Sequence, residues 1–191
     1  MKPRLLAIAA GILITLFHAP AGFAAKDKHN DPYVQGPVDE GTLTREVRHR
    51  LVMLPYYGVF DDIGFIVNGS TVTLEGQVRE PVLKSDATKT VRKIAGVTEV
   101  VNNLEVLPLS PNDDRIRRDM FRAVYGSEDI GMRYGFSAVP SIHIIVKNGN
   151  VRLEGVVANE FDRNLINVKA QGVAGAFTVV NELQVENQQT R

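Results

Sequence analysis

Hydrophobic and polar positions follow the same succession of patterns twice along the chain. Each half begins with apolar residues three or four positions apart, a spacing that places their side chains on one face of a helix. These residues are Leu43, Val47, Leu51 and Leu54 in the first half and Ile116, Met120, Ala123 and Val124 in the second. They predict a helix at about 42–54 that Pro55 ends, and a second helix that Asn112 or Asp113 caps.

A pair of strands joined by a tight turn is predicted after each of these helices. Asn68-Gly69 and Asn148-Gly149 are dipeptides that favour hairpin turns. The strands are predicted at 64–68 and 72–78 in the first half and at 142–147 and 151–157 in the second. Gly76 and Gly155, near two strand ends, indicate a bulge or a close approach between chain segments.

A second helix and a last strand complete each half. The apolar residues that mark these helices are Ala87, Val91, Ile94 and Ala95, and then Phe161, Leu165 and Val168. They are expected to be the buried stripes of their helices. Gly96 and Gly175 end the helices, and the last strands are predicted at 99–107 and 178–185.

These elements predict an α+β protein of two tandem small α-β-β-α-β modules, each a three-stranded sheet covered on one face by two helices. A right-handed crossover makes the second and third strands of a module parallel, and the first strand can lie between them. The modules are expected at 42–108 and 112–186, joined by a stiff connector with two prolines and followed by a tail at 187–191.

The two halves are copies of one unit. Residues 72–106 align with residues 151–185 without a gap, and twelve of the 35 positions are identical. Chance would give roughly two or three identities at ordinary composition, so the chain contains a duplication. The repeat length is that of a small domain.

Composition limits the class of protein. The chain has 191 residues, of which 44% are hydrophobic and 23% charged, as in globular proteins. Its 22 basic residues balance 22 acidic ones, so bulk charge does not favour nucleic-acid binding. The absence of cysteine excludes disulfides, thiolate metal sites and a lipidated N-terminal cysteine.

The first 24 residues have the three parts of a secretory signal peptide. Lys2 and Arg4 precede an apolar run at 5–17, and small residues follow it. Cleavage is predicted after Ala24 or, alternatively, after Ala21, and an uncleaved anchor is the other interpretation. Residues 25–41 are rich in charge, proline and glycine and predict a flexible leader. We therefore expect an exported protein that is not a lipoprotein.

Two repeated sequence motifs carry a resemblance to a known family. The first is V-T-L-E-G-Q-V at 72–78 and V-R-L-E-G-V-V at 151–157. The second is I-A-G-V-T-E-V-V-N-N-L-E-V at 94–106 and V-A-G-A-F-T-V-V-N-E-L-Q-V at 173–185. In this order, and duplicated, the motifs resemble the BON domain, named for bacterial osmotically inducible and nodulation proteins. The resemblance implies a periplasmic or envelope protein that binds phospholipid or envelope proteins and supports envelope integrity or the osmotic stress response.

The sequence offers no constellation of catalytic residues. His29, His49 and His143 have no spacing typical of metal ligands. The adjacent carboxylates Asp61 and Asp62 could serve acid–base chemistry, but a solvated turn is the favoured interpretation. The glutamate of each L-E-G motif is expected to face solvent. We therefore predict no enzyme activity, no cofactor and no metal site.

Two surfaces of the second half are candidates for binding. Arg115, Arg118 and Arg122 share one outward arc of its first helix, with Phe121 at the edge. The arc suits anionic lipid headgroups, or else it is an ordinary solvated face that Asp114 and Asp119 partly neutralise.

The other surface is an apolar insertion at 130–140, in which Met132, Tyr134, Phe136 and Val139 are either exposed contacts or packed between the modules. Packing between the modules is favoured, because two small units need additional core.

The function expected is peripheral binding to an anionic phospholipid membrane. The alternative is a protein–protein or oligomerisation module that binds an envelope protein through its sheet edges. Nucleic acid is not an expected partner.

Overall fold

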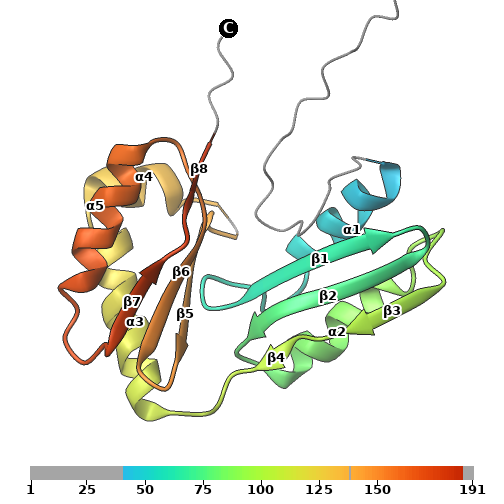
Figure 1. Ribbon diagram of the computed structural model, residues 1–191, viewed down its shortest axis with the longest axis horizontal. Helices are drawn as coiled ribbons and strands as arrows, with labels where there is room; N and C mark the ends of the chain where they lie inside the picture. Colours follow the sequence, from blue (N-terminus) through green and yellow to red (C-terminus); the bar gives the residue numbers. More distant parts are fainter. Residues whose placement is uncertain (1–40, 138, 187–191) are drawn as a thin grey trace, which may run out of the picture.

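The computed structural model of the protein describes residues 41–137 and 139–186 (Figure 1). The predicted signal peptide, the leader up to residue 40 and the tail at 187–191 lie outside the described residues. The described chain forms two modules with the same order of elements, as the duplication predicts.

The first module contains two helices and a sheet. Its elements are α1 (Thr42–Val52), β1 (Asp62–Asn68), β2 (Thr71–Val78), α2 (Pro81–Val91), β3 (Glu99–Asn102) and β4 (Glu105–Val106). The second module repeats this order and adds a short helix in the insertion. Its elements are α3 (Pro111–Tyr125), α4 (Glu128–Tyr134), β5 (Ile142–Lys147), β6 (Asn150–Val157), α5 (Glu160–Gln171), β7 (Thr178–Asn181) and β8 (Gln184–Val185).

The second strand of each module lies at the centre of its sheet. β2 pairs antiparallel with β1 and parallel with β3 and β4, and β6 pairs with β5, β7 and β8 in the same way. The prediction of parallel second and third strands is confirmed, but placing the first strand between them is wrong. β2 is the longest strand of its module, and its Val72, Leu74 and Val78 side chains are fully buried. A central position gives this strand hydrogen-bonded neighbours on both edges.

The last strand of each module is interrupted by an asparagine. Asn102 Nδ2 donates to the Lys84 carbonyl in α2 at 2.9 Å, and its Oδ1 accepts from the Leu104 N–H at 2.9 Å. Asn181 makes the equivalent two bonds in the second module. The side chain therefore replaces a ladder hydrogen bond and divides one predicted strand into two short ones.

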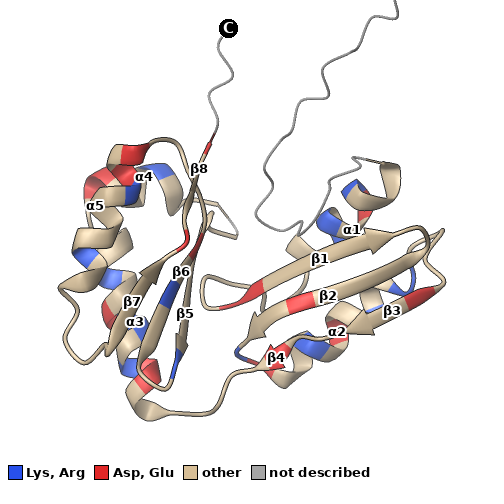
Figure 2. Cartoon of the chain, viewed as in Figure 1, with Lys and Arg blue, Asp and Glu red and all other residues tan. Residues whose placement is uncertain are grey.

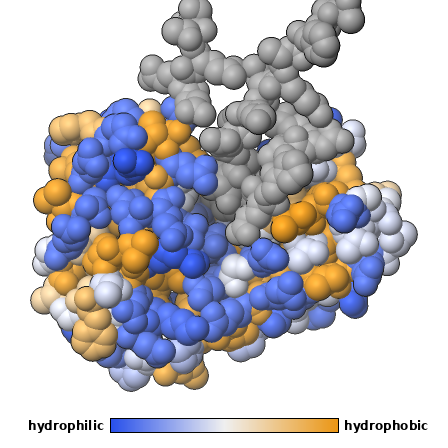
Figure 3. Space-filling view, in the orientation of Figure 1, coloured by the Kyte–Doolittle hydropathy of each residue, from blue (hydrophilic) through white to orange (hydrophobic). Residues whose placement is uncertain are grey.

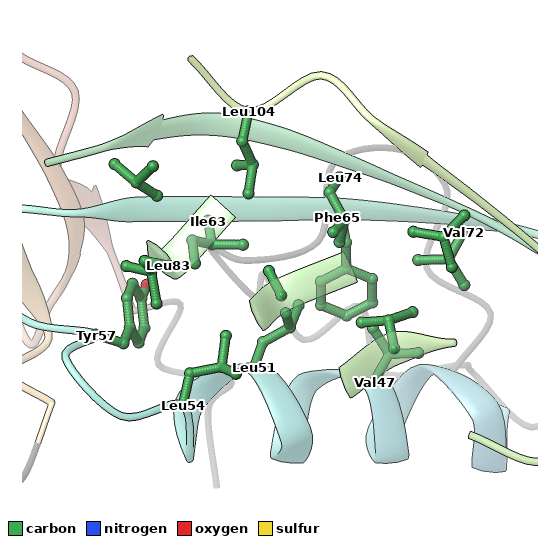
Figure 4. Packing of buried hydrophobic residues seen from close by; sticks show 14 of the residues in the cluster. Val47, Leu51, Leu54, Tyr57, Ile63, Phe65, Val72, Leu74, Leu83 and Leu104 are labelled. Atoms are coloured by element: carbon green, nitrogen blue, oxygen red, sulfur yellow. The ribbon is translucent and has the colours of Figure 1, made fainter. Parts of the chain in front are cut away.

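Both helices of a module cover one face of its sheet. Figure 4 shows Val47 and Leu51 of α1, and Leu54 just after it, pointing toward the sheet residues Phe65 and Ile63. Leu83, Ala87 and Val91 of α2 complete this core. The corresponding core of the second module is built by α3, α4 and α5 against β5 and β6.

The buried face of α5 differs from the predicted one. Asp162, Ile166 and Ala170 are buried, whereas Phe161 and Val168 are exposed. The sequence contains two apolar stripes on this helix, and polar contacts of Asp162 select the less apolar one. Ala95 of the first module is also exposed, because α2 ends at Val91.

Gly76 and Gly155 lie where two strands approach closely. Both have positive φ angles, of 118° and 124°. A Cβ at Gly155 would lie 1.9 Å from the Ser141 carbonyl oxygen, and one at Gly76 would lie 2.4 Å from the Asp62 carbonyl oxygen. The prediction of a close approach is confirmed at both positions.

The modules meet where the loop at 55–61 contacts β5, which we call the joint. The Ile144 N–H donates to the Val59 carbonyl at 2.7 Å, and the rings of Tyr57 and His143 stack at 5.6 Å. Val59 and Phe60 pack against the core of the second module. The edge of β5 is thereby covered by the first module.

Only part of the insertion at 130–140 packs between the modules. Val139 packs against the core of the first module, as the favoured interpretation requires. Tyr134 is buried within the second module, however, and Met132 and Phe136 are exposed. The favoured interpretation is wrong for these three residues, because the insertion folds as α4 against α3 of its own module.

Candidate functional site

Ser110 caps the start of α3, so the prediction that Asn112 or Asp113 does so is wrong. Ser110 Oγ accepts a hydrogen bond from the Asp113 N–H at 3.2 Å, and Pro111 occupies the first helical position, where no N–H is needed. The buried Asp113 carboxylate instead accepts two N–H bonds of 2.8 Å from the β5–β6 turn. This contact orients α3 on the sheet.

The three arginines predicted on the outer arc of α3 are all exposed. Figure 2 shows basic and acidic residues alternating along this helix. Asp119 forms ion pairs with Arg115, at 3.2 Å, and with Arg122. Within the described residues, Arg118 has no carboxylate partner. Three guanidinium groups and one carboxylate leave a net positive charge on the arc.

Arg117 points in the opposite direction and is buried. Its Nη2 donates to the Val146 carbonyl at 2.6 Å, and its Nη1 lies 2.7 Å from Asp114. Asp114 therefore forms its ion pair with Arg117, although its own side chain stays 43% exposed. Of the two acids expected to neutralise the arc, Asp119 is the one that forms ion pairs with it.

Met132 and Phe136 lie next to the arginine arc. A groove of about 400 Å³ is lined by residues from both predicted surfaces, among them Phe121, Arg122, Met132 and Phe136. Phe121 also packs edge-on against Phe60 of the first module, with ring centroids 6.3 Å apart. The structure thus joins two surfaces that the sequence presented separately, and we call them together the α3–α4 surface.

Tyr134 holds α4 in place instead of contacting a ligand. Its O–H donates to Asp162 at 2.6 Å, and its oxygen accepts from the Ala158 N–H at 2.9 Å. Arg133 adds an ion pair to Asp162 at 2.7 Å. Burial, followed by the bond to the carboxylate, raises the pKa of the Tyr134 hydroxyl.

Sequence reasoning missed the role of Asp162. The duplication aligns this residue with Leu83, which is part of the first apolar core. The sequence did contain a signal for this role, because the repeat places the carboxylate of Asp162 where the first module has a core leucine. Its partners, Arg133 and Tyr134, belong to the insertion, which the first module lacks.

A second polar cluster lies beside the joint, where β6 of the second module faces β1 and β2 of the first. Arg152 forms ion pairs with Glu154 at 2.5 Å and with Asp62 at 3.9 Å, and it donates to Gln77 at 3.1 Å. Burial raises the pKa of Asp62 to about 6 despite the Arg152 charge. Burial and the neighbouring Asp62 charge raise the pKa of Glu154 to about 7.

The adjacent carboxylates of the first module do not form a solvated turn. Asp61 and Asp62 are both buried. Asp61 accepts the backbone N–H groups of Gly58 and Arg79, which closes the loop before β1, and burial raises its pKa against these hydrogen bonds. Glu154, expected to face solvent, is partly buried at the joint.

Residues 41–137 and 139–186 contain neither a metal-binding cluster nor a membrane-spanning helix. No group of three histidine, aspartate or glutamate side chains is arranged to hold a metal ion. None of the helices there has the length and hydropathy that crossing a bilayer requires.

Fold and surface together define a class of protein: a tandem pair of small α/β modules, one of which presents mixed basic and apolar side chains. The chain belongs to the BON-domain family. The family model of the BON domain matches residues 39–108 and 133–187, about two thirds of the chain. BON-domain proteins are generally non-enzymatic and typically periplasmic or envelope-associated, and their domains bind membranes or protein partners.

Two solved structures of CdsD, a structural protein of the Type III secretion system of Chlamydia trachomatis, are similar to this chain. The structure of its C-terminal domain shares 15% identity over 78% of this chain and 99% of that chain, with a TM-score of 0.30. The other shares 14% identity over 76% and 93%, with a TM-score of 0.29. These scores are too low to support an argument. The comparison with curated proteins found no match.

Proposed function

We propose that this is an exported, non-enzymatic envelope protein that binds anionic phospholipid membranes peripherally through the α3–α4 surface. The observation that carries the proposal is that Arg122 lines the same groove as Phe121, Met132 and Phe136. A lipid surface offers phosphate groups next to hydrocarbon, and this groove places the Arg122 cation next to apolar side chains, with Glu128 as the acidic residue of its lining.

Electrostatic contacts of the arginine arc and apolar contacts of Met132 and Phe136 would both contribute to membrane binding. An arginine near an anionic surface contributes on the order of 1 kcal/mol, so the arc alone would bind weakly. Met132 and Phe136 are 66% and 80% exposed and can enter the interface without unfolding the core. Because Asp119 offsets part of the charge, the binding should be reversible and sensitive to salt.

The family supports the biological setting. BON-domain proteins are typically found in the periplasm or envelope, and the predicted signal peptide agrees with that compartment. A role in envelope integrity or osmotic stress follows from the same resemblance.

Co-sedimentation with lipid vesicles tests the electrostatic part. Residues 25–191 should pellet with anionic vesicles at low salt, and not with zwitterionic vesicles or at high salt. Arg118→Glu with Arg122→Glu should abolish pelleting. Arg115 is retained, because it also donates to the Ala174 carbonyl at 3.3 Å. Arg45→Glu with Arg92→Glu changes two exposed arginines of the first module and is the matched control.

The apolar part has its own variant pair. Met132→Ser with Phe136→Ser should weaken binding to anionic vesicles. Met53→Ser with Phe177→Ser removes a methionine and a phenylalanine of similar exposure, 68% and 77%, and should leave binding unchanged. Absence of pelleting by the unmodified chain would reject lipid binding and favour a protein partner from the envelope.

A further inference from the structure

Helix α5 exposes an apolar stripe that the core of its own module does not use. Phe161 is 70% exposed and Val168 is 67% exposed. With Ile166 at 0° and about 100° per residue, Val168 falls at about 200° and Phe161 at about 220°. Leu165, partly buried, falls at about 260°. Phe161 and Val168 therefore point directly away from the sheet.

This outward arc of α5 is also free of charge. Between about 140° and 260° the remaining residues are Asn164, Gln171 and Gly172. All residues of α5 are described, and its charged side chains fall outside that range. The arc can therefore leave bulk water without desolvating an ionised group. Desolvating a charge costs more free energy than desolvating a neutral polar side chain.

The outward arcs of α3 and α5 face the same side of the module. Both helices pack on one face of the sheet and share a core that contains Ile116, Met120, Ile166 and Ala170. With Ile116 at 0°, Arg118 and Arg122 fall at about 200° and 240°, opposite the buried residues. Figure 1 shows α3 and α5 covering the same face of the sheet, and orange residues lie among blue ones over α5 in Figure 3.

Hydrogen bonds tie α5 and the loop that follows it to the other two helices. At its start, Asp162 is bonded to Arg133 and Tyr134, which lie between Met132 and Phe136 in sequence. At its end, the Ala174 carbonyl accepts from Arg115 of the arginine arc. The three helices thus lie together, and their exposed residues include apolar and basic side chains as well as the acids Glu128, Asp129 and Glu160 at the starts of α4 and α5.

The first module lacks the equivalent stripe. Val82, Asp86 and Lys89 occupy the positions of Phe161, Leu165 and Val168 in the repeat. Lys89 and Asp86 form an ion pair at 3.2 Å on the surface of α2. The apolar replacements therefore occur in the same module as the arginine arc and α4.

We infer that α5 is part of the membrane-binding surface, so that the helical layer of the second module lies flat on an anionic bilayer with Phe161 and Val168 at the boundary between headgroups and hydrocarbon. The inference rests on the proposed function. A bilayer suits the arrangement because a flat layer of three helices presents guanidinium groups and uncharged apolar residues side by side.

Tryptophan fluorescence can test this inference, because the chain contains no tryptophan. Three single variants, Phe161→Trp, Phe136→Trp and Val82→Trp, place one indole on α5, beyond α4 and on α2. Val82 is the repeat equivalent of Phe161 and is 45% exposed. With anionic vesicles containing brominated lipid, the indoles at 161 and 136 should shift to the blue and be quenched. The indole at 82 should do neither.

The possible outcomes separate this inference from the proposed function. Quenching at 136 but not at 161 would retain lipid binding and overturn the role of α5, whereas no quenching at either would overturn both. A blue shift at 161 that rises with protein concentration in the absence of vesicles would indicate that α5 mediates self-association. That result would also overturn the role of α5 in membrane binding. As a second readout, Phe161→Ser with Val168→Ser should weaken vesicle binding by roughly tenfold, and an unchanged affinity would contradict the inference.

Discussion

At the scale of single residues, Asp162 is the largest departure of the second module from the first. The carboxylate is fully buried where the repeat has Leu83, and it is bonded to Arg133 and Tyr134. Burying a charge is costly unless partners offset it, and here the donors to Oδ2 come from α4 and from Asn159. Asp162 therefore links the core of the module to the position of Met132 and Phe136.

Replacing Asp162 by leucine, the residue of the first module, should loosen α4. Asp162→Leu removes the acceptor of the Tyr134 hydroxyl and the partner of Arg133. The expected loss is about 1–3 kcal/mol in the free energy of unfolding, measured with urea. Amide exchange at 128–136 should accelerate more than exchange in β5 and β6.

The matched control is Asp86→Leu, which introduces the residue that α5 has at the equivalent position. Its carboxylate forms an ion pair with Lys89 and accepts a 3.5 Å hydrogen bond from Ser85, both at the surface, so the change should stay within about 0.5 kcal/mol. If Asp162→Leu were as stable as the unmodified chain, α4 would be held by its apolar contacts alone.

Local geometry explains which residues the sequence could predict. The outward arc of Arg118 and Arg122 depends only on helical periodicity, and both side chains are exposed as expected. The burial of Arg117 depends on the Val146 carbonyl, 29 residues away, and the burial of Asp61 depends on the Arg79 N–H. Such partners belong to other elements, so spacing along the chain does not reveal them.

At the scale of elements, the repeat predicted the strands well and their order less well. β5 has the predicted bounds, and β6 begins one residue earlier than expected. The hairpin turns and alternating residues that define these strands are local. The order of strands depends instead on which edge of β2 is free, and the face of α5 depends on Asp162 and α4. Neither has a local pattern.

The glycines of the L-E-G motifs allow a prediction at this scale. Gly155→Ala should destabilise the second module by about 1–3 kcal/mol or more, because its φ is 124° and a Cβ would clash with the Ser141 carbonyl. Urea unfolding measures the effect. Gly58→Ala is the control, since its φ is not positive and the nearest atom to the new Cβ is 4.0 Å away. Equal stability of the two variants would show that the strands can separate without loss.

At the scale of the whole molecule, the joint turns two similar modules into an asymmetric pair. The Val59 carbonyl in the loop at 55–61 accepts a hydrogen bond from the Ile144 N–H at the edge of β5, and Tyr57 of the same loop stacks on His143. The sequence repeat does not predict this contact. The loop of the first module contacts the second module, and the same contact cannot be made twice within one pair. Phe60 extends the joint to Phe121, so the arrangement of the modules also shapes one wall of the α3–α4 surface.

The joint should also make stability depend on pH. The charged groups facing each other there are Asp62, Glu105, Lys147, Arg152, Glu154 and Glu182. Burial raises the pKa of Asp62 from 3.8 to about 6 and that of Glu154 from 4.5 to about 7. A carboxyl with a raised pKa contributes stability below its unfolded pKa and loses it as pH rises through the folded value. These two groups therefore favour folding at mildly acidic pH.

His143 has the opposite effect over part of this range. Burial lowers the pKa of its imidazole from 6.5 to about 4, against hydrogen bonds to Asp61 and Gly58. Its contribution is complete above pH 6.5 and declines as pH falls toward 4. Two carboxyls outweigh one imidazole, so the free energy of unfolding should fall as pH rises from about 5 to 7.

Glu154→Gln should remove most of that slope, because Asp62 and His143 then oppose each other nearly one for one between about pH 4.5 and 6. Urea unfolding at pH 5, 6 and 7 measures the slope for the unmodified chain and the variant. Glu75→Gln changes the repeat-equivalent glutamate of the first module, which has no ion pair among the described residues, and should leave the slope intact. A slope that is flat or positive in the unmodified chain, or that both variants reduce equally, would mean that the joint does not control the response.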